Sequence, residues 1–178
     1  MSGLRLREAR AEDWEAVAAL HAASWQRSYR GIMPDGFLDR EVVEERRRHW
    51  RSKMAAPSHG DLILLAEDET GLAGFVAAWP DSQGGSDVLV DNLHVAEGRQ
   101  GQGIGRTLLG ETAVRSAEAG RRSLHLWVFD ANADAMRFYL ALGGIAAEHG
   151  FETIEGRPVP HTRIVWTNLG MLASACRR

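Results

Sequence analysis

Three glycines at alternate positions, Gly101, Gly103 and Gly105, stand directly before a run of helical spacing in the segment EGRQGQGIGRTLL (97–109). Glycine in the first turn of a helix costs up to about 1 kcal/mol per residue relative to alanine, so this cluster needs a reason beyond folding. A backbone without side chains lets another group approach closely. The segment also follows a strand-like run that ends at Val95, which predicts a strand, a short loop and a helix.

A junction of this kind directs free backbone N–H groups and the positive end of a helix dipole to one place, and this favours a phosphate group. The dinucleotide fingerprint, Gly-x-Gly-x-x-Gly, does not fit the Gly-x-Gly-x-Gly spacing, and no acidic ribose-binding residue follows near position 125. The phosphate-loop pattern that ends in Gly-Lys-Ser/Thr is absent too. On this segment alone, tight packing of the helix start against a strand remains the alternative to phosphate binding.

Strand-like and helix-like segments alternate along the rest of the chain and predict a mixed α/β fold. Helices are expected from residue 11 past Trp25, and at 38–56, 105–119 and 133–142. Strands are expected at 5–8, 61–68, 71–79, 87–95, 123–129, 146–154 and 162–168, with a loop at 80–86. In the 38–56 helix, we expect Val43, Trp50 and Met54 to be buried and the charged run 44–48 to be mostly solvated.

Composition narrows the class of protein. A chain of 178 residues fits a single domain, 1–178. Its net charge of -3 argues against a general binder of nucleic acids or anionic membranes, and it lacks an apolar run of the ~20 residues that a membrane span needs. We therefore expect a cytoplasmic protein without nucleic-acid or membrane partners. The single cysteine, Cys176, has no disulfide partner, and no metal-ligand cluster is found.

The glycine-rich segment closely resembles the acetyl-CoA motif of the GNAT superfamily of N-acetyltransferases, in which Gln/Arg-x-x-Gly-x-Gly/Ala follows a strand. The residues QGQGIG at 100–105 fit each defined position. Downstream, Asn132, Ala135, Phe138-Tyr139 and Gly143 resemble the second motif of the superfamily, Asn-x-x-Ala-x-x-Phe-Tyr-x-x-x-Gly-Phe. Gly144 departs from it, which we expect to affect packing more than chemistry. The order of elements matches the family across the chain, which implies a GNAT-like acyl-CoA N-acyltransferase fold of class α/β (α+β) with a mixed, mostly antiparallel sheet flanked by helices.

The resemblance implies that acetyl-CoA is the cosubstrate and that no metal takes part. The main chain of the strand end would pair with the pantetheine arm, and the loop N–H groups would hold the pyrophosphate. Asn132 would contact the pantetheine arm or cap its helix, and two arginines would add charge near the phosphates or remain ordinary surface residues. The implied cofactor-binding residues are Leu93, His94, Val95, Arg99, Gln100, Gly101, Gln102, Gly103, Ile104, Gly105, Arg106, Asn132 and Tyr139.

Direct transfer to a primary amine demands a base more than an acid. An ammonium with a pKa near ~10 must lose a proton at a cost of roughly 4 kcal/mol at neutral pH, whereas a thiol with a pKa of ~8.5 leaves readily. Asp91 is the first candidate base and Glu67 the second, although either can be an ordinary polar residue and some members of the superfamily use water alone. Tyr139 would protonate the departing thiolate, or it is a core tyrosine. His94 faces away from Asp91 by strand alternation, and we interpret it and His21 as structural histidines.

The acceptor is expected against the segment 25–35, where the superfamily builds its acceptor wall. Trp25, Tyr29 and Asp35 would bind an amine-bearing small molecule or peptide there, or the aromatic residues belong to the core. An amino acid, a polyamine, an aminoglycoside and a peptide N-terminus all remain candidates, and a homodimer is left open. Two other classes also remain: a degenerate acyl-CoA-binding module that senses the cofactor without turnover, and a scaffold protein.

Overall fold

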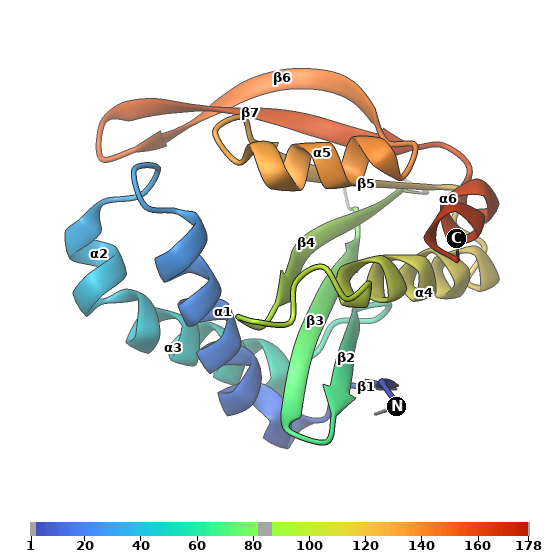
Figure 1. Cartoon of the computed structure of the whole chain (residues 1–178), viewed down its shortest axis with the longest axis horizontal. Coiled ribbons are helices and arrows are strands. Elements are labelled where there is room, and N and C mark those ends of the chain that lie inside the picture. The colour runs from blue at the N-terminus through green and yellow to red at the C-terminus, as the bar shows by residue number, and fades with distance from the viewer. Residues whose placement is uncertain (1–2, 82–86, 178) are drawn as a thin grey trace. The chain divides into compact units, whose positions relative to one another are not determined.

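The computed structural model describes residues 3–81 and 87–177, so positions 82–86 of the expected loop lie outside the described residues. The strands form one seven-stranded sheet in the order β1-β2-β3-β4-β5-β7-β6 (Figure 1). The strands are β1 (Arg5–Glu8), β2 (Leu62–Asp68), β3 (Gly71–Pro80), β4 (Asp87–Val95), β5 (Ser123–Phe129), β6 (Ile145–Ile154) and β7 (Arg157–Trp166). The helices are α1 (Trp14–Ser28), α2 (Asp35–Arg40), α3 (Val42–Ala55), α4 (Ile104–Glu118), α5 (Ala133–Ala141) and α6 (Leu169–Cys176), with a short 3-10 turn, Ala11–Asp13, before α1.

The sheet is mixed and mostly antiparallel, as predicted. Strand β1 pairs with β2, β5 with β7, and β6 with β7, all antiparallel, whereas β4 pairs with β5 in parallel. Strands β4 and β5 are paired from Asp87↔Ser123 to Leu89↔His125. Beyond this last pair, β4 continues to Val95 and β5 to Phe129. Among the described residues, no helix is long and apolar enough to cross a membrane.

The chain groups into two compact units, each described by itself below. The first unit contains residues 1–77 and 92–108, and the second contains 78–91 and 109–178. Strands β3 and β4 and helix α4 therefore contribute residues to both units. A single domain that spans 1–178 stays a prediction.

In the first unit, the expected helix at 38–56 is two helices, because Glu41 separates α2 from α3. Buried positions in α3 recur at every fourth residue: Val42, Arg46, Trp50 and Met54. The prediction for Val43 was wrong, since its exposed fraction is 47% and the neighbouring Val42 is fully buried instead. This spacing also places Arg46 in the interior, so the charged run is not solvated throughout.

In the second unit, two features differ from the prediction. Strand β7 begins at Arg157 instead of 162, because β6 pairs with residues 157–165. Strand β5 pairs only with 161–166, so Pro158 and Pro160 lie where β7 has a single neighbouring strand. Helix α6 was not predicted. Asn168 caps it by accepting a hydrogen bond from the N–H of Met171 at 3.0 Å. A Cβ at Gly110 would come within 2.7 Å of Cys176 Cβ, so the glycine allows α4 and α6 to pack closely.

Candidate functional site

The loop between β4 and α4 requires glycine at three positions. Gly98, Gly101 and Gly103 have φ angles of 74°, 76° and 81°, in the left-handed region that other residues adopt only under strain. A Cβ added at any of them would have no atom within 4 Å, so the glycines do not serve close packing at these positions. The alternative of tight packing therefore does not explain Gly101 and Gly103.

Two glutamine side chains hold the loop in this shape. Gln100 donates from Nε2 to the carbonyl oxygen of Val95 at 3.1 Å and accepts from the N–H of Gly98 at 3.1 Å. Gln102 donates to the carbonyl oxygen of Gly98 at 3.2 Å. Both amides therefore bind main-chain atoms of the same loop, and their hydrogen bonds fix where its glycines lie.

The loop that these glutamines stabilise contains a row of backbone N–H groups without a hydrogen-bond acceptor among the described residues. From Gly101 to Arg106, no backbone N–H donates to another atom of the described residues, and the first N–H of this region to close a helical bond is that of Thr107, to Gly103 O at 2.9 Å. These donors surround the N-terminus of a 15-residue helix, α4, whose dipole adds positive potential. The loop therefore fits an anion such as the pyrophosphate of a nucleotide cofactor.

The two arginines of this region differ. Arg99 binds Asp68 at 2.9 Å and donates to Thr70 Oγ1, so the β2–β3 hairpin already holds its guanidinium. Arg106 lies in the first turn of α4, is half-buried, and forms no ion pair with the described residues. Of the two, Arg106 is the one with a charge still available to a phosphate group.

The end of β4 lies against α1. A Cβ at Gly74 of β3 would come within 3.0 Å of the carbonyl oxygen of His94, so the glycine allows β3 to approach this strand end closely. Ser24 Oγ and His94 Nδ1 are 2.8 Å apart, which links α1 directly to the predicted cofactor strand Leu93–Val95. Ser24 was not predicted, but its position three residues after His21 on the same helical face was the available signal.

His94, which is half-buried, packs against the fully buried His21, and this contact fits the interpretation of both as structural histidines. Their ring centroids are 4.4 Å apart, and Trp50 donates from Nε1 to His21 Nδ1 at 2.9 Å. Because an indole N–H can only donate, His21 is neutral with its proton on Nε2. Burial lowers the pKa of His94 to about 3, and the nearby charges of Arg27 and Arg46 add to the decrease. Burial also lowers the pKa of His21, so both imidazoles stay neutral.

The predicted acceptor residues lie in the first unit. The rings of Trp25 and Tyr29 are 5.5 Å apart, and the guanidinium of Arg46 lies over the ring of Trp25, 4.4 Å from its centroid. Asp35 is held by Arg30 at 3.1 Å. Its carboxylate is therefore already paired with a cation, whereas the two neighbouring aromatic rings are half-buried.

Glu67, the second candidate base, belongs to an ion-pair cluster at the β1–β2 edge. Arg7 donates to its two carboxylate oxygens at 2.9 and 2.6 Å and also binds Asp13. These hydrogen bonds lower the pKa of Glu67 below its usual value. A carboxylate stabilised in this way is a weaker proton acceptor than a free one.

The remaining predicted residues lie in the second unit. Asp91 is exposed on β4. Asn132 is the N-cap of α5, where its Oδ1 accepts from the N–H of Ala135 at 3.3 Å, so the capping role is realised. Tyr139 is 9% exposed, and its ring packs edge-on against Trp166 at a centroid distance of 6.0 Å.

Trp166 explains why Gly144 departs from the family pattern. A Cβ at Gly144 would come within 2.5 Å of Ile164 and 2.8 Å of the Trp166 ring. The indole also donates to the carbonyl oxygen of Leu142 at 3.0 Å, which holds it in this place. Side chains of β7 therefore fill the space that a larger side chain at position 144 would need. The difference from the family motif at this position is a matter of packing.

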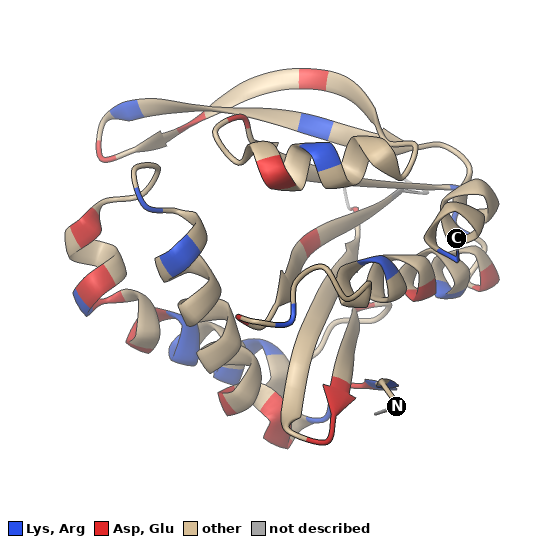
Figure 2. Ribbon diagram, in the orientation of Figure 1, with Lys and Arg blue, Asp and Glu red and all other residues tan. Residues whose placement is uncertain are grey.

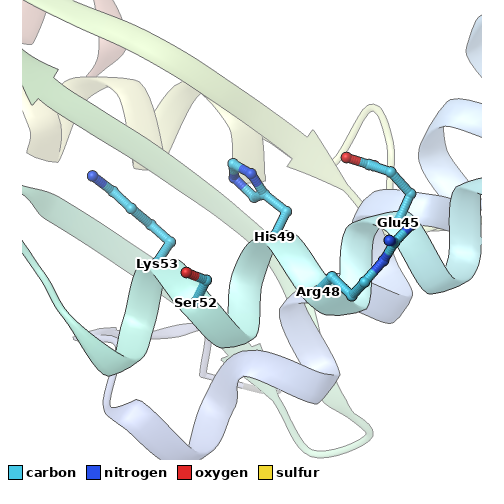
Figure 3. A pocket seen from close by; sticks show the side chains of 5 residues that line it. All are labelled: Glu45, Arg48, His49, Ser52 and Lys53. Carbon is cyan, nitrogen blue, oxygen red and sulfur yellow. The ribbon is translucent and has the colours of Figure 1, made fainter.

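A separate hollow of about 560 Å3 lies on α3, lined by Glu45, Arg48, His49, Ser52 and Lys53 (Figure 3). None of these residues is among the predicted site residues, and Lys53 binds Asp61 at 2.8 Å. Charges of both signs lie along α2 and α3 (Figure 2). Within residues 3–81 and 87–177, no group of three or more His, Cys, Asp or Glu side chains has an arrangement that could hold a metal ion.

Comparison with known proteins agrees with the two motifs. A sequence profile of the acetyltransferase (GNAT) family matches residues 14–143. Among curated proteins, the "Uncharacterized N-acetyltransferase YuaI" of Bacillus subtilis is 29% identical over 176 residues, covering 97% of this chain and 98% of that protein. A probable N-acetyltransferase of Mycobacterium tuberculosis is 29% identical over 143 residues, 78% of each chain.

Solved structures share the fold. The PaiA N-acetyltransferase of Thermoplasma acidophilum, solved in complex with coenzyme A, superposes with a TM-score of 0.73 at 20% identity, over 90% of this chain and 98% of that one. YncA, a putative acetyltransferase of Salmonella typhimurium solved with acetyl-CoA, has a TM-score of 0.69 at 20% identity and covers 93% of this chain and 94% of its own.

Proposed function

Because the chain belongs to the GNAT family of acetyltransferases, we propose that it transfers the acetyl group of acetyl-CoA to a primary amine of a small molecule or a peptide. The β4–α4 loop carries this proposal. It combines left-handed glycines, glutamines that fix their positions, and open N–H groups at a helix N-terminus. Such a loop matches the needs of a pyrophosphate group.

The cosubstrate would be held by main-chain atoms more than by side chains. In the first unit, the loop N–H groups of 100–105 bind the pyrophosphate, the strand end 93–95 pairs with the amides of the pantetheine arm, and Arg106 supplies charge to a phosphate. In the second unit, the amide of Asn132 binds the same arm while its Oδ1 caps α5. These assignments follow the family motif, residue by residue.

Two proton transfers complete the reaction. When bound, acetyl-CoA supplies a thioester carbonyl for the amine to attack and a thiolate that leaves as the C–S bond breaks. Tyr139 donates its phenolic proton to that thiolate, and Asp91 takes a proton from the acceptor amine, directly or through water. Between the two candidate bases, Asp91 is preferred, because the hydrogen bonds from Arg7 weaken Glu67 as a proton acceptor.

Thiol release tests the proposal most directly. The purified chain is incubated with acetyl-CoA and pooled primary amines, and free CoA is measured with a thiol reagent, while calorimetry measures acetyl-CoA binding separately. Amine-dependent release of CoA is the expected result. Binding without release for any amine would favour a cofactor-sensing module, and the absence of binding would favour a scaffold protein.

The cellular setting follows from the same proposal. A net charge of -3 and an amine acceptor fit a cytoplasmic enzyme that acts on small molecules or peptides instead of nucleic acids. Gel-shift assays at physiological salt and light scattering test nucleic-acid binding and the homodimer, respectively.

A further inference from the structure

Trp127 is an exposed tryptophan on β5, in the second unit. The chain has six tryptophans, all within the described residues, and Trp127 alone among them is exposed, with an exposed fraction of 40%. Single apolar residues are common at protein surfaces, so this exposure by itself assigns no role to the indole. The residues that surround it on β6 and β7 indicate one.

Three neighbouring strands bring Trp127 and His161 together. Trp127 lies on β5 and His161 on β7, and their ring centroids are 4.4 Å apart with an angle of 49° between the planes. His161 is paired with Gly150 of β6, where an added Cβ would come within 2.7 Å of His161 Nε2 and 3.8 Å of Trp127 Cζ3. Glycine weakens the interior of a strand and often marks a place where another group approaches closely. Gly150 therefore leaves the space in which the imidazole packs against the exposed indole.

The register of the sheet places Trp127 level with the preferred base. Strands β4 and β5 run parallel and are paired up to Leu89↔His125. Two residues further along the same strands lie Asp91 and Trp127, and both are exposed. Paired strands are about 4.7–4.9 Å apart, and an amine two carbons from an aromatic ring is about as long. An acceptor of this length therefore reaches Asp91 with its nitrogen while its ring lies on Trp127.

The charges beside the indole are compatible with an amine. Arg163 is the cross-strand partner of Trp127, and its guanidinium lies 3.8 Å from the carboxylate of Glu148. This carboxylate balances the positive charge next to the indole, so a protonated amine meets less repulsion there. The carboxylate of Asp91 attracts the amine toward the other strand.

An exposed indole discriminates between ligands by the kind of group placed on it. A second aromatic ring gains from stacked or edge-to-face contact with an indole in addition to the apolar area that is buried, whereas a saturated ring of the same size gains from the area alone. An ammonium group can also lie over an indole. The nitrogen that is acetylated, however, has to lose its proton, and the preferred base for this step lies on β4. The acceptor therefore presents another part of its structure to Trp127.

We propose that Trp127 and His161 form an aromatic platform for the acceptor, and that the acceptor is a small amine with an aromatic ring close to its nitrogen. This rests on the proposed acetyl transfer. The acceptor ring stacks on the indole, and His161 is a positioning residue that holds the indole. The amine nitrogen bonds to the thioester carbonyl carbon and gives its proton to Asp91, while the C–S bond breaks and the thiolate takes the proton of Tyr139. Trp127 selects the acceptor and transfers no proton.

Two amines that differ only in their ring test this proposal. Phenethylamine carries an aromatic ring, and cyclohexylethylamine carries its saturated counterpart. Thiol release gives kcat/KM for each, and the ratio of aromatic to saturated is compared between variants at one pH, so that the different pKa values of the amines cancel. We expect Trp127→Leu to lower this ratio by about fivefold, mainly through KM for phenethylamine. Trp127→Phe, which keeps an aromatic ring, should retain at least about half of the ratio of the parent protein.

Phe151→Leu is the matched control. Phe151 is 67% exposed on β6, and because neighbouring residues of a strand point to opposite faces, it lies on the other face from Gly150. Its replacement should leave the ratio unchanged. Circular dichroism checks that each variant is folded, and Trp127→Thr takes the place of Trp127→Leu if the latter does not fold.

An unchanged ratio in the folded Trp127 variant would overturn this inference and leave acetyl transfer intact, and so would an equal decrease in Phe151→Leu. If neither amine releases thiol, calorimetry with phenethylamine and CoA-loaded protein separates the two proposals. Binding that the Trp127 variant weakens would support the platform and overturn acetyl transfer. The absence of binding, or binding that the variant does not weaken, would overturn both.

Discussion

Replacing Gly103 by valine separates two roles that glycine has in the β4–α4 loop. The φ angle of 81° imposes a left-handed conformation, and an added Cβ meets no atom within 4 Å. The variant therefore carries backbone strain without a steric clash. If this loop holds a pyrophosphate, the new side chain also occupies space that the phosphate needs, and affinity falls beyond what strain alone explains.

The magnitudes follow from the structure. A left-handed conformation costs a residue with a Cβ about 2 kcal/mol, which lowers the melting temperature by roughly 4–8 °C in a protein of this size. Each hydrogen bond to a charged group contributes about 1.5–3 kcal/mol, so displacing a phosphate from two N–H groups weakens binding by at least ~100-fold. Gly120→Val is the matched control, because Gly120 has a φ of 78° and equally open surroundings but follows the C-terminal end of α4, outside the β4–α4 loop.

Calorimetric titration with CoA and urea unfolding measure the two effects separately. Both variants should lose about 2 kcal/mol of unfolding free energy. Only Gly103→Val should lose most of its affinity for CoA, while Gly120→Val should stay within about threefold of the parent protein. A folded Gly103→Val protein with unchanged affinity would refute the assignment of the loop to the pyrophosphate, and an equal loss in both variants would assign the effect to strain.

Three further substitutions test the proton transfers and the ion-pair cluster. Tyr139→Phe should lower kcat by about 10- to 1,000-fold with little change in acetyl-CoA affinity; full kcat where chemistry limits turnover would make Tyr139 a packing residue. Asp91→Asn should lower the rate at least tenfold at neutral pH and recover at high pH, where the amine loses its proton unaided, whereas a loss equal at all pH values would indicate a structural role. Glu67→Gln should cost about 1 kcal/mol of unfolding free energy at pH 7. Because Arg7 lowers the folded-state pKa of Glu67, this stabilisation is complete above the unfolded pKa of about 4.3 and disappears as pH falls through the lower folded value, so a difference persisting in acid urea unfolding would contradict it.

Local patterns were sufficient to predict most elements. The predicted strands 87–95 and 123–129 match β4 and β5, and α4 and α5 begin and end within one residue of their predictions. Hydrophobic periodicity and glycine placement act over neighbouring residues, and such signals survive in a linear sequence. The same holds for the loop, because the requirement for glycine at positions 101 and 103 comes from their own φ angles.

Other features depended on contacts between residues that are far apart in the sequence, and a local sequence pattern does not predict such contacts. Helix α6 packs against α4 through Gly110, which is 66 positions before Cys176 in the sequence (176 − 110). The break at Glu41 gives α3 a buried face that includes Arg46, whose charge is accommodated by Glu45 and by the ring of Trp25 on another helix. From the sequence alone, a charged run such as 44–48 is predicted to be solvated, because the aromatic ring that covers one of its arginines lies on another helix.

The sequence by itself therefore determined the family, most of the elements and the glycine positions of the β4–α4 loop, because each depends on residues close together in the chain. Only the tertiary structure decided which charged side chains are paired within the protein and which remain available to a ligand. It paired Glu67 with Arg7, Asp35 with Arg30 and Arg99 with Asp68, and it brought His94 to Ser24. Electrostatic interactions act through space, so the chemical character of a site follows from folding partners that sequence spacing does not reveal.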